Sequence, residues 1–275
     1  MLEKIYIARH GFRMNWVTQH WTSPTGTPRD PPMAAYGEEQ AKELAAFFVS
    51  LPDDEKPTAI FSSPFYRCVQ TAAPTGAALN LPVYVENGIS EWYSPVVPGT
   101  GLHPIPPPAS KLASLFPAFR IDPEGWNPPT YIPDRKGETM PQIHDRCRAF
   151  LSAFIPRVEQ LDQGKHTRIL LVSHAATVIA LTRELVGDRE LPMRAACCSL
   201  TTLERSEQDK NQTVGVWKVK ELAVGHYLKG GLERDWGFED AIVQDGQVVN
   251  DRGDPGTEND VQEAIGLQVA IPSRM

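Results

Sequence analysis

The sequence predicts an α/β fold of three layers, with a mostly parallel central sheet and helices on both faces. Two observations carry this prediction. Short apolar runs rich in β-branched residues alternate along the chain with segments of helical period, as in successive β-α units. One such run, residues 167–175 (TRILLVSHA), is almost continuously apolar, which is typical of a parallel strand buried on both faces.

The first part of the chain contains three predicted strands and two predicted helices. Residues 4–8 (KIYIA), 58–63 (TAIFSS) and 81–89 (LPVYVENGI) are the strand candidates. Between the first two, apolar side chains recur at helical spacing over GEEQAKELAAFFVSL, which predicts a helix with one face on the sheet. A second helix is expected to begin at the Ser-Pro pair after the second strand, which places Arg67 in its first turn.

Residues 90–136 differ in character from the rest of the chain. Prolines recur throughout and no long periodic segment is present, so this insertion is not expected to form the core of the sheet. Long insertions of this kind are usually lids or binding loops, and we predict a proline-rich lid that selects substrates or partners; the alternative is a passive surface strap. The main domain is expected to span residues 1–225, followed by an irregular, acidic and partly disordered C-terminal extension at residues 226–275.

The later part of the chain begins with a strong helix signal. Thr139 and Gln142 have the spacing of a capping box, and an apolar stripe follows them as far as Leu161. After the apolar run that reaches His174, another helix is expected to end near Gly187. Two further strands, CCSLTTLE and VGVWKVKELAV, are expected to close the sheet.

Composition limits the functions that remain open. The 275 residues are 41% hydrophobic and carry a formal net charge of -7, which argues against a broad surface that binds nucleic acid directly. The four cysteines lack CxxC spacing and the N-terminus has no apolar run of signal-peptide length, so we expect a reducing compartment, cytoplasm or nucleus. No stretch approaches the roughly 18 apolar residues of a membrane span, so no membrane partner is expected.

Two histidines and three arginines are expected to meet at one edge of the sheet. His10 and His174 each follow a strand candidate, and parallel sheets bind ligands at the carboxyl ends of their strands. A phosphoryl group spreads negative charge over its oxygens, for which arginine offers permanently charged donors. Arg9, Arg13 and Arg67 are candidates for this role, and His174 is expected to contact the same oxygens. The sequence therefore predicts phosphoryl transfer with His10 as the nucleophile, the alternative being that either histidine is structural.

The departing oxygen also needs a proton donor, and a carboxylic acid is the expected group. Glu91, in GISEWY, is the preferred candidate because it follows the third predicted strand. Glu86 and Glu138 are rivals on composition alone. No spaced cluster of histidine, cysteine and aspartate indicates a metal site, so neither a metal nor another cofactor is expected.

Five motifs, in chain order, resemble those of the histidine phosphatase superfamily, which has the phosphoglycerate mutase-like fold: IYIARHGFRMNW, SSPFYRCVQT, GISEWY, KGET and LLVSHAA. The resemblance covers about residues 4–205 and implies that residues 1–225 form a histidine phosphatase domain. By motif, it implies that His10 is phosphorylated and that Glu91 is the acidic proton donor. The phosphate pocket that it implies consists of Arg9, Arg67 and His174.

The chain departs from the mutase pattern, in which Glu and Ser or Thr follow Arg-His-Gly. Phe12 and Arg13 stand there instead, and Arg13 resembles the extra arginine of the branch that includes the protein tyrosine phosphatase domains of suppressor-of-T-cell-receptor-signalling proteins. SEWY also lacks the Glu-Arg-x-Tyr pattern of the mutases. The resemblance therefore implies a phosphatase rather than a mutase.

Within the superfamily, RHGFRMNW, SSPFYRC, GISEWY and KGET look most similar to the histidine phosphatase subunit of fungal transcription factor IIIC and its free-standing cytosolic paralogue. Residues and resemblance together predict a metal-independent, acid-type phosphomonoesterase that acts through a phosphohistidine. Its expected substrates are phosphoproteins, phosphotyrosine among them, or small phosphoesters. The alternative is a weakly active or inactive scaffold subunit of a transcription factor IIIC-like assembly, with protein partners. The oligomeric state stays open.

Overall fold

A central sheet organises the computed structural model, which describes residues 1–206, 212–241, 243–244, 247–248, 256 and 264–270. Within these residues the sheet has seven strands, which in chain order are β1 (Lys4–Arg9), β2 (Ala59–Ser62), β3 (Val83–Val85), β4 (Ile121–Asp122), β6 (Arg168–Ser173), β7 (Leu200–Arg205) and β8 (Trp217–Val224). Their order across the sheet is β4-β3-β2-β6-β1-β7-β8. The first five pair in parallel, β7 pairs antiparallel with β1, and β8 pairs antiparallel with β7. The predicted α/β fold with a mostly parallel sheet is confirmed.

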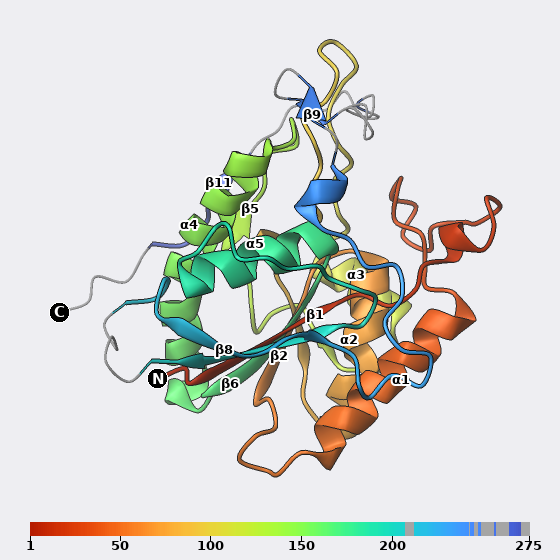
Figure 1. Cartoon of the computed structure of the whole chain (residues 1–275). Coiled ribbons are helices and arrows are strands. Elements are labelled where there is room, and N and C mark those ends of the chain that lie inside the picture. The colour runs from red at the N-terminus through yellow and green to blue at the C-terminus, as the bar shows by residue number, and fades with distance from the viewer. Residues whose placement is uncertain (207–211, 242, 245–246, 249–255, 257–263, 271–275) are drawn as a thin grey trace.

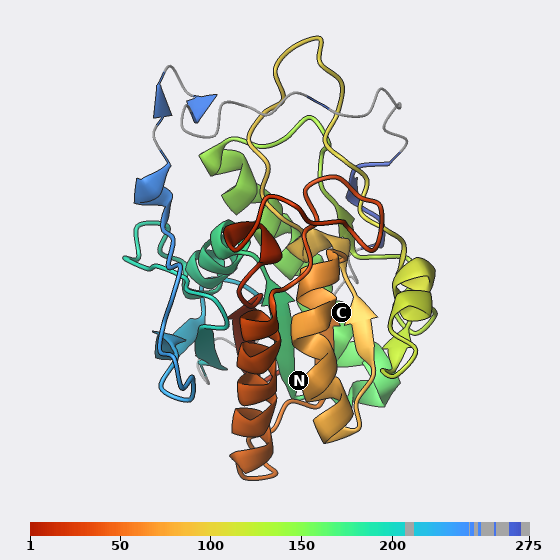
Figure 2. The same ribbon diagram turned by 90° about the vertical axis from the view of Figure 1, so that its right-hand side faces the viewer.

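Helices cover both faces of this sheet. They are α1 (Ala35–Ser50), α2 (Tyr66–Leu79), α3 (Ala109–Leu115), α4 (Met140–Gln160) and α5 (Ala175–Val186), with short 3-10 turns η1 (Met14–Trp16), η2 (Asn87–Ile89) and η3 (Leu161–Gly164). α4 and α5 pack together on one face, and α1 and α2 lie side by side over the other (Figures 1 and 2). The three predicted layers are therefore present.

Two hydrophobic cores result, one on each face, and β1 contributes to both because successive side chains of a strand point to opposite sides. Ile5 and Ile7 pack with the residues of α4 and α5, whereas Tyr6 and Ala8 pack with those of α1 and α2. All six residues of β1 are buried. Burial on both faces fixes the strand firmly, so the residues at its carboxyl end have a well-defined position.

The predicted ends of the later helices agree with the structure. The Thr139 hydroxyl accepts the backbone N–H of Gln142, and the Gln142 side chain accepts the N–H of Thr139, which completes the capping box at the start of α4. Gly187 ends α5 with a φ of 84°, in the left-handed region that favours glycine. The third predicted strand is shorter than expected, because β3 gives way to η2.

Residues 90–136 lie outside the core of the sheet, as expected, but they add one strand at its edge. The segment contains α3, β4 and β5 (Tyr131–Ile132), and β4 pairs in parallel with β3, with Ile121 opposite Val83. Proline is tolerated near an edge strand because only one side of that strand needs a hydrogen-bonding partner. The remainder of the segment rises above the carboxyl edge of the sheet (Figure 2).

The C-terminal extension contains only short elements among its described residues: η5 (Phe238–Asp240), β9 (Val243–Gln244), β10 (Gln247–Val248) and β11 (Gly266–Leu267). β9 pairs with β10, and β11 pairs with β5 of the insertion. Part of residues 226–275, for which partial disorder was expected, lies outside the described ranges. Of the helices in those ranges, none has the length and apolar character needed to cross a membrane.

Candidate active site

His10 stands directly after β1, where the chain leaves the sheet. Its backbone N–H donates to the carbonyl of Ser173 at 2.9 Å, and its side chain is 1% exposed. The residue after it, Gly11, is packed so closely that a β-carbon would lie 2.7 Å from the carbonyl oxygen of Gly37. The backbone at the end of β1 is therefore fixed by its neighbours, and the imidazole with it.

The protonation state of His10 follows from its contacts. Nδ1 lies 2.8 Å from the carbonyl oxygen of Gly11, and a carbonyl only accepts, so Nδ1 carries the hydrogen and the lone pair lies on Nε2. Burial lowers the pKa of His10 well below its usual value, and the charges of Arg67 and Arg9 lower it further. The imidazole is therefore neutral, which is the form able to act as a nucleophile.

Arg67, in the first turn of α2 as predicted, is held between two carboxylates. Nη1 donates to Asp30 at 3.0 Å, Nη2 donates to Glu91 at 2.9 Å, and the side chain is 1% exposed. Burial alone would lower the pKa of Arg67, but these carboxylates outweigh it and raise the pKa. The guanidinium is thus a fixed, permanent positive charge beside the end of β1.

Two further arginines act on His10 through their charge. Arg9 donates through Nη1 to the carbonyl of Ala195 at 2.8 Å and to that of Arg234. Arg13 stacks on Trp16, with its guanidinium carbon 4.2 Å from the ring centroid, and burial lowers its pKa to about 10. Both remain cationic at neutral pH, so their charges add to that of Arg67 beside the imidazole.

His174, the residue before α5, is completely buried and bridges two polar side chains. Nδ1 lies 3.1 Å from the Glu91 carboxylate, and Nε2 lies 2.8 Å from the hydroxyl of Ser63. Because a carboxylate only accepts, Nδ1 carries the hydrogen and Ser63 donates to Nε2. Burial lowers the pKa of His174 to about 4, against the opposing effect of Glu91, so this ring is neutral as well.

Glu91 completes the cluster. Its side chain is 20% exposed, whereas its partners Arg67 and His174 are buried. Burial raises the pKa of its carboxyl, but His174 and Arg67 outweigh burial and hold the pKa well below its usual range. The carboxyl is therefore ionised in this state. A group that donates a proton from this position needs its pKa raised first.

The two rival carboxylates have other partners. Glu86 is fully buried and accepts hydrogen bonds from the indole N–H of Trp126 and from the backbone N–H groups of Gly88 and Thr130. Glu138 forms an ion pair with Arg146 at 2.8 Å. Both carboxylates are therefore engaged in holding loops together, away from His10.

The cluster opens into a cavity of about 540 Å³. Five of the predicted site residues line it: Arg9, His10, Arg13, Arg67 and Glu91. His174 lies behind this lining and reaches the cavity through Glu91 and Arg67. The structure therefore brings all six predicted site residues together at one edge of the sheet.

One group of potential metal ligands exists in the described part of the chain. Atoms of His10, Glu91 and His174 lie within 4.8 Å of one another. The positive charges of Arg67, Arg9 and Arg13 act on the His10 imidazole, and they would repel a metal cation bound there. The charge of the site therefore fits an anion such as a phosphoryl group.

A family model for the histidine phosphatase superfamily (branch 1) matches residues 5–218. The chain belongs to this superfamily. Transcription factor tau 55 kDa subunit of Saccharomyces cerevisiae is 33% identical to this chain over 309 aligned positions, which cover 99% of the chain and 69% of the relative. Ecdysteroid-phosphate phosphatase of Drosophila melanogaster is 25% identical over 258 positions, 79% of the chain and 32% of that protein. The resemblance predicted from the motifs is confirmed.

Solved structures show the same fold. The ecdysone phosphate phosphatase from Bombix mori, in complex with tungstate, has a TM-score of 0.62 at 17% identity, over 87% of this chain and all of the other (100%). A mycobacterial glucosyl-3-phosphoglycerate phosphatase has a TM-score of 0.53 at 17% identity, over 81% of this chain and 100% of the other. At this identity the likeness concerns the fold alone.

Sequence reasoning missed three residues of the histidine phosphatase site. Asp30 pairs with Arg67 and also accepts the backbone N–H of Tyr66 at 2.8 Å, at the start of α2. Ser63 stands within the SSPFYRC motif, but nothing in that motif indicated its hydrogen bond to His174. Trp236, beyond the predicted boundary at residue 225, lines the cavity and forms a β-bridge with Ala195. An aspartate or tryptophan in a polar loop gives no periodic signal, and contact alone identifies them.

Replacing Asp30 with asparagine is expected to destabilise the protein. Asp30 and Arg67 are 0% and 1% exposed, and burial raises the pKa of Asp30, yet the permanent charge of Arg67 requires the ionised carboxylate beside it. Removing one partner of such a pair costs about 3 kcal/mol, which chemical denaturation measures as a lower free energy of unfolding. Asp53→Asn, at an exposed pair with Lys56, is the control and should leave unfolding unchanged. Equal unfolding of Asp30→Asn and wild type would show that Glu91 alone satisfies Arg67.

Proposed function

We propose that this histidine phosphatase hydrolyses phosphomonoesters through a phosphohistidine formed on His10. The observation that carries the proposal is a neutral, buried imidazole whose Nδ1 is held by the Gly11 carbonyl while arginines surround it. A neutral ring supplies the lone pair of Nε2, and the cations stabilise the charge on the phosphoryl oxygens. Each group needed for phosphoryl transfer thus has a residue in the cluster to supply it.

In the first step, Nε2 of His10 attacks phosphorus in line with the departing oxygen. The N–P bond forms as the P–O bond to the alcohol breaks. Arg9, Arg13 and Arg67 hold the phosphoryl oxygens, and the Nδ1–H of His174 is assigned to one of them as well. Glu91 gives its proton to the departing oxygen, so the alcohol leaves neutral.

The proton on Glu91 arrives with the substrate. Arg67 and His174 keep the Glu91 pKa low in the free protein. A phosphoryl group that engages these two side chains withdraws their stabilisation from Glu91 and adds negative charge nearby, and both effects raise the pKa of Glu91. A substrate that enters as the monoanion can then transfer its proton to this carboxylate.

In the second step, the ionised Glu91 takes a proton from water. The water oxygen attacks phosphorus and the N–P bond breaks, and inorganic phosphate takes the proton from Glu91 and leaves as the monoanion, which restores neutral His10 and ionised Glu91. The arginines supply the positive charge throughout, so the proposed cycle is independent of metal ions and of other cofactors. Phosphoproteins, including those with phosphotyrosine, and small phosphoesters are the proposed substrates.

A cysteine nucleophile is the nearest chemical rival, because Cys68 lies 3.4 Å from Nε2 of His174. Burial raises the pKa of this thiol far above its usual value, and the thiolate is the form that reacts. Cys68 therefore contributes packing rather than nucleophilic catalysis.

The second candidate function is a scaffold with little turnover. It is favoured by the relative named as a transcription factor tau subunit, which aligns with 99% of this chain. In that case the insertion and the C-terminal extension would bind other proteins, in the nucleus or the cytoplasm, without direct contact to nucleic acid. The filled catalytic positions favour the enzyme.

Hydrolysis of p-nitrophenyl phosphate by the wild-type protein in EDTA tests the proposal. We expect turnover between about pH 4 and 8, and a labelled phosphoenzyme that survives base but is lost in acid, as phosphohistidine is. Absence of both turnover and labelling, in a protein that is folded by circular dichroism, would move the conclusion to the scaffold.

A further inference from the structure

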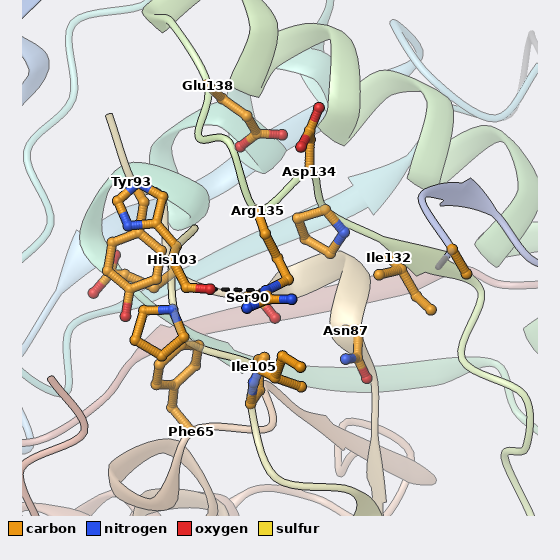
Figure 3. Close-up of a pocket in the computed structure, with 15 residues that line it drawn as sticks. Phe65, Asn87, Ser90, Tyr93, His103, Ile105, Ile132, Asp134, Arg135 and Glu138 are labelled. Carbon is orange, nitrogen blue, oxygen red and sulfur yellow. Dashed lines mark hydrogen bonds between the residues drawn. The ribbon is translucent and has the colours of Figure 1, made fainter. Parts of the chain in front are cut away.

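A second cavity of about 550 Å³ adjoins the catalytic one, and Glu91 and Tyr93 line both. Its walls come from the residue before α2, from Asn87 in η2, from the insertion, from the segment before α4, and from Ala264 in the C-terminal extension. The apolar lining residues are Phe65, Pro104, Ile105, Pro106, Ile132 and Pro133. Phe65, Ile105 and Ile132 surround this space in Figure 3. The volume lies within the roughly 300–1,000 Å³ of ordinary ligand sites.

The wall between the two cavities is well ordered by its contacts. Tyr93 stacks on His103 (Figure 3). Their ring centroids are 4.5 Å apart and their planes are inclined by 16°. The His103 ring donates to the carbonyl of Ser94 at 2.7 Å, and Arg135 donates to the carbonyl of His103 at 2.8 Å. The later part of the insertion is thereby attached to its first residues, which include Glu91. Its apolar side chains have a fixed position relative to the proton donor.

The stereochemistry of the proposed reaction determines which half of a substrate enters each cavity. In an in-line displacement the departing oxygen lies on the opposite side of phosphorus from the attacking nitrogen. Glu91 must reach that oxygen to protonate it, and its carboxylate lies within 4.8 Å of the His10 imidazole. The phosphoryl half therefore stays with the arginines, and the alcohol half extends past Glu91. The second cavity begins at that point.

Resting on the function proposed above, we propose that the second cavity holds the leaving alcohol and that the preferred substrate is the phosphomonoester of a bulky apolar or aromatic alcohol. Four arginines line the first cavity, whereas proline, isoleucine and phenylalanine supply most of the apolar lining of the second. Besides Glu91, the charged residues of the second cavity already have partners: Asp134 accepts the backbone N–H of Lys136, Arg135 donates to the carbonyl of His103, and Glu138 pairs with Arg146. An apolar alcohol loses its water contacts there without disturbing these pairs, whereas a charged alcohol such as serine, with its amino and carboxylate groups, would compete with them or lie against apolar walls. Asn87, which also faces this space, can orient a single polar group on the alcohol.

The test compares two substrates and two matched variants. Ile105 and Val97 both lie in the insertion and are 50% and 43% exposed, so aspartate is tolerated at either position, but only Ile105 lines the second cavity. The specificity ratio is kcat/KM for 1-naphthyl phosphate divided by that for phosphoserine. We expect this ratio to favour 1-naphthyl phosphate in the wild type and to fall about tenfold in Ile105→Asp. Val97→Asp should keep the wild-type ratio.

An unchanged ratio in Ile105→Asp, or an equal fall in Val97→Asp, would overturn the assignment of the cavity while leaving the phosphatase intact. If the wild type hydrolyses neither compound, the proposed catalysis fails, and calorimetric binding of 1-naphthyl phosphate then decides the cavity separately. Weaker binding of 1-naphthyl phosphate to Ile105→Asp than to Val97→Asp would support the assignment of the cavity to the leaving alcohol. Equal binding to both variants would contradict that assignment.

Discussion

Replacing His10 with alanine is expected to lower the turnover of p-nitrophenyl phosphate by about 10⁴-fold or more, the scale seen when a covalent nucleophile is removed. The reason is geometric as well as chemical. Of the two neutral imidazoles at the site, only His10 lines the cavity, since His174 is completely buried behind Glu91. No ring is left in a position to replace it.

A buried histidine elsewhere provides the matched control. His144 in α4 is 6% exposed, and its Nδ1 lies 2.8 Å from the carbonyl of Met140, so it resembles His10 in burial and in its hydrogen bond. His144→Ala should keep wild-type turnover and labelling. Thermal unfolding of both variants separates catalysis from folding. Full activity in His10→Ala would place the nucleophile elsewhere and end the phosphohistidine mechanism.

Replacing Glu91 with glutamine is expected to have an effect that depends on the leaving group. Protonation by a positioned acid contributes about 10² to 10⁴-fold when the departing oxygen is strongly basic. Turnover of phosphoserine should fall by that factor, because an alkoxide leaves poorly without a proton. Turnover of p-nitrophenyl phosphate should fall far less, since p-nitrophenolate leaves readily as the anion. An equal loss on both substrates would show that Glu91 positions Arg67 and His174 and does not donate the proton.

The pH dependence of the wild type follows from the same assignment. Because the Glu91 pKa lies well below its usual value, the free carboxylate is ionised and the proton must enter with the substrate monoanion. The second pKa of a phosphomonoester is about 6, so kcat/KM should fall as the pH rises above that value. The His10 pKa is lowered from 6.5, so loss of the neutral nucleophile occurs only at lower pH. Activity is therefore expected on the acid side, and a maximum above about pH 7 would contradict the assignment.

The principal site residues were predictable because they stand at the ends of strands. His10 follows β1 and His174 follows β6, and these two strands pair in parallel with Arg9 opposite Ser173. Parallel neighbours bring their carboxyl ends to the same edge, so two histidines 164 positions apart in sequence meet without any knowledge of loops. The choice of Glu91 over its rivals depended on the same reasoning, and the structure places it beside both His174 and Arg67.

Prolines limited what the sequence could predict for the insertion. Their frequency indicated that the segment is not the core of the sheet, but it gave no sign of β4 at the sheet edge, where the restriction on proline is weak. The insertion also supplies Ile105 and His103 to a cavity next to Glu91. No periodic pattern in the sequence indicates such a contribution, because irregular chain has no repeat that fixes the direction of a side chain.

The sequence by itself determined the alternation of strands and helices, the sheet edge at which the candidate site lies, and the histidines and arginines that gather there. Periodicity and strand ends are local properties, and a parallel sheet converts them into position. Only the tertiary structure decided that Asp30 holds Arg67, that Ser63 holds His174, and that a second cavity begins at Tyr93. These features arise where loops fold back on the sheet, and the contacts of loops depend on packing between segments that no local pattern connects.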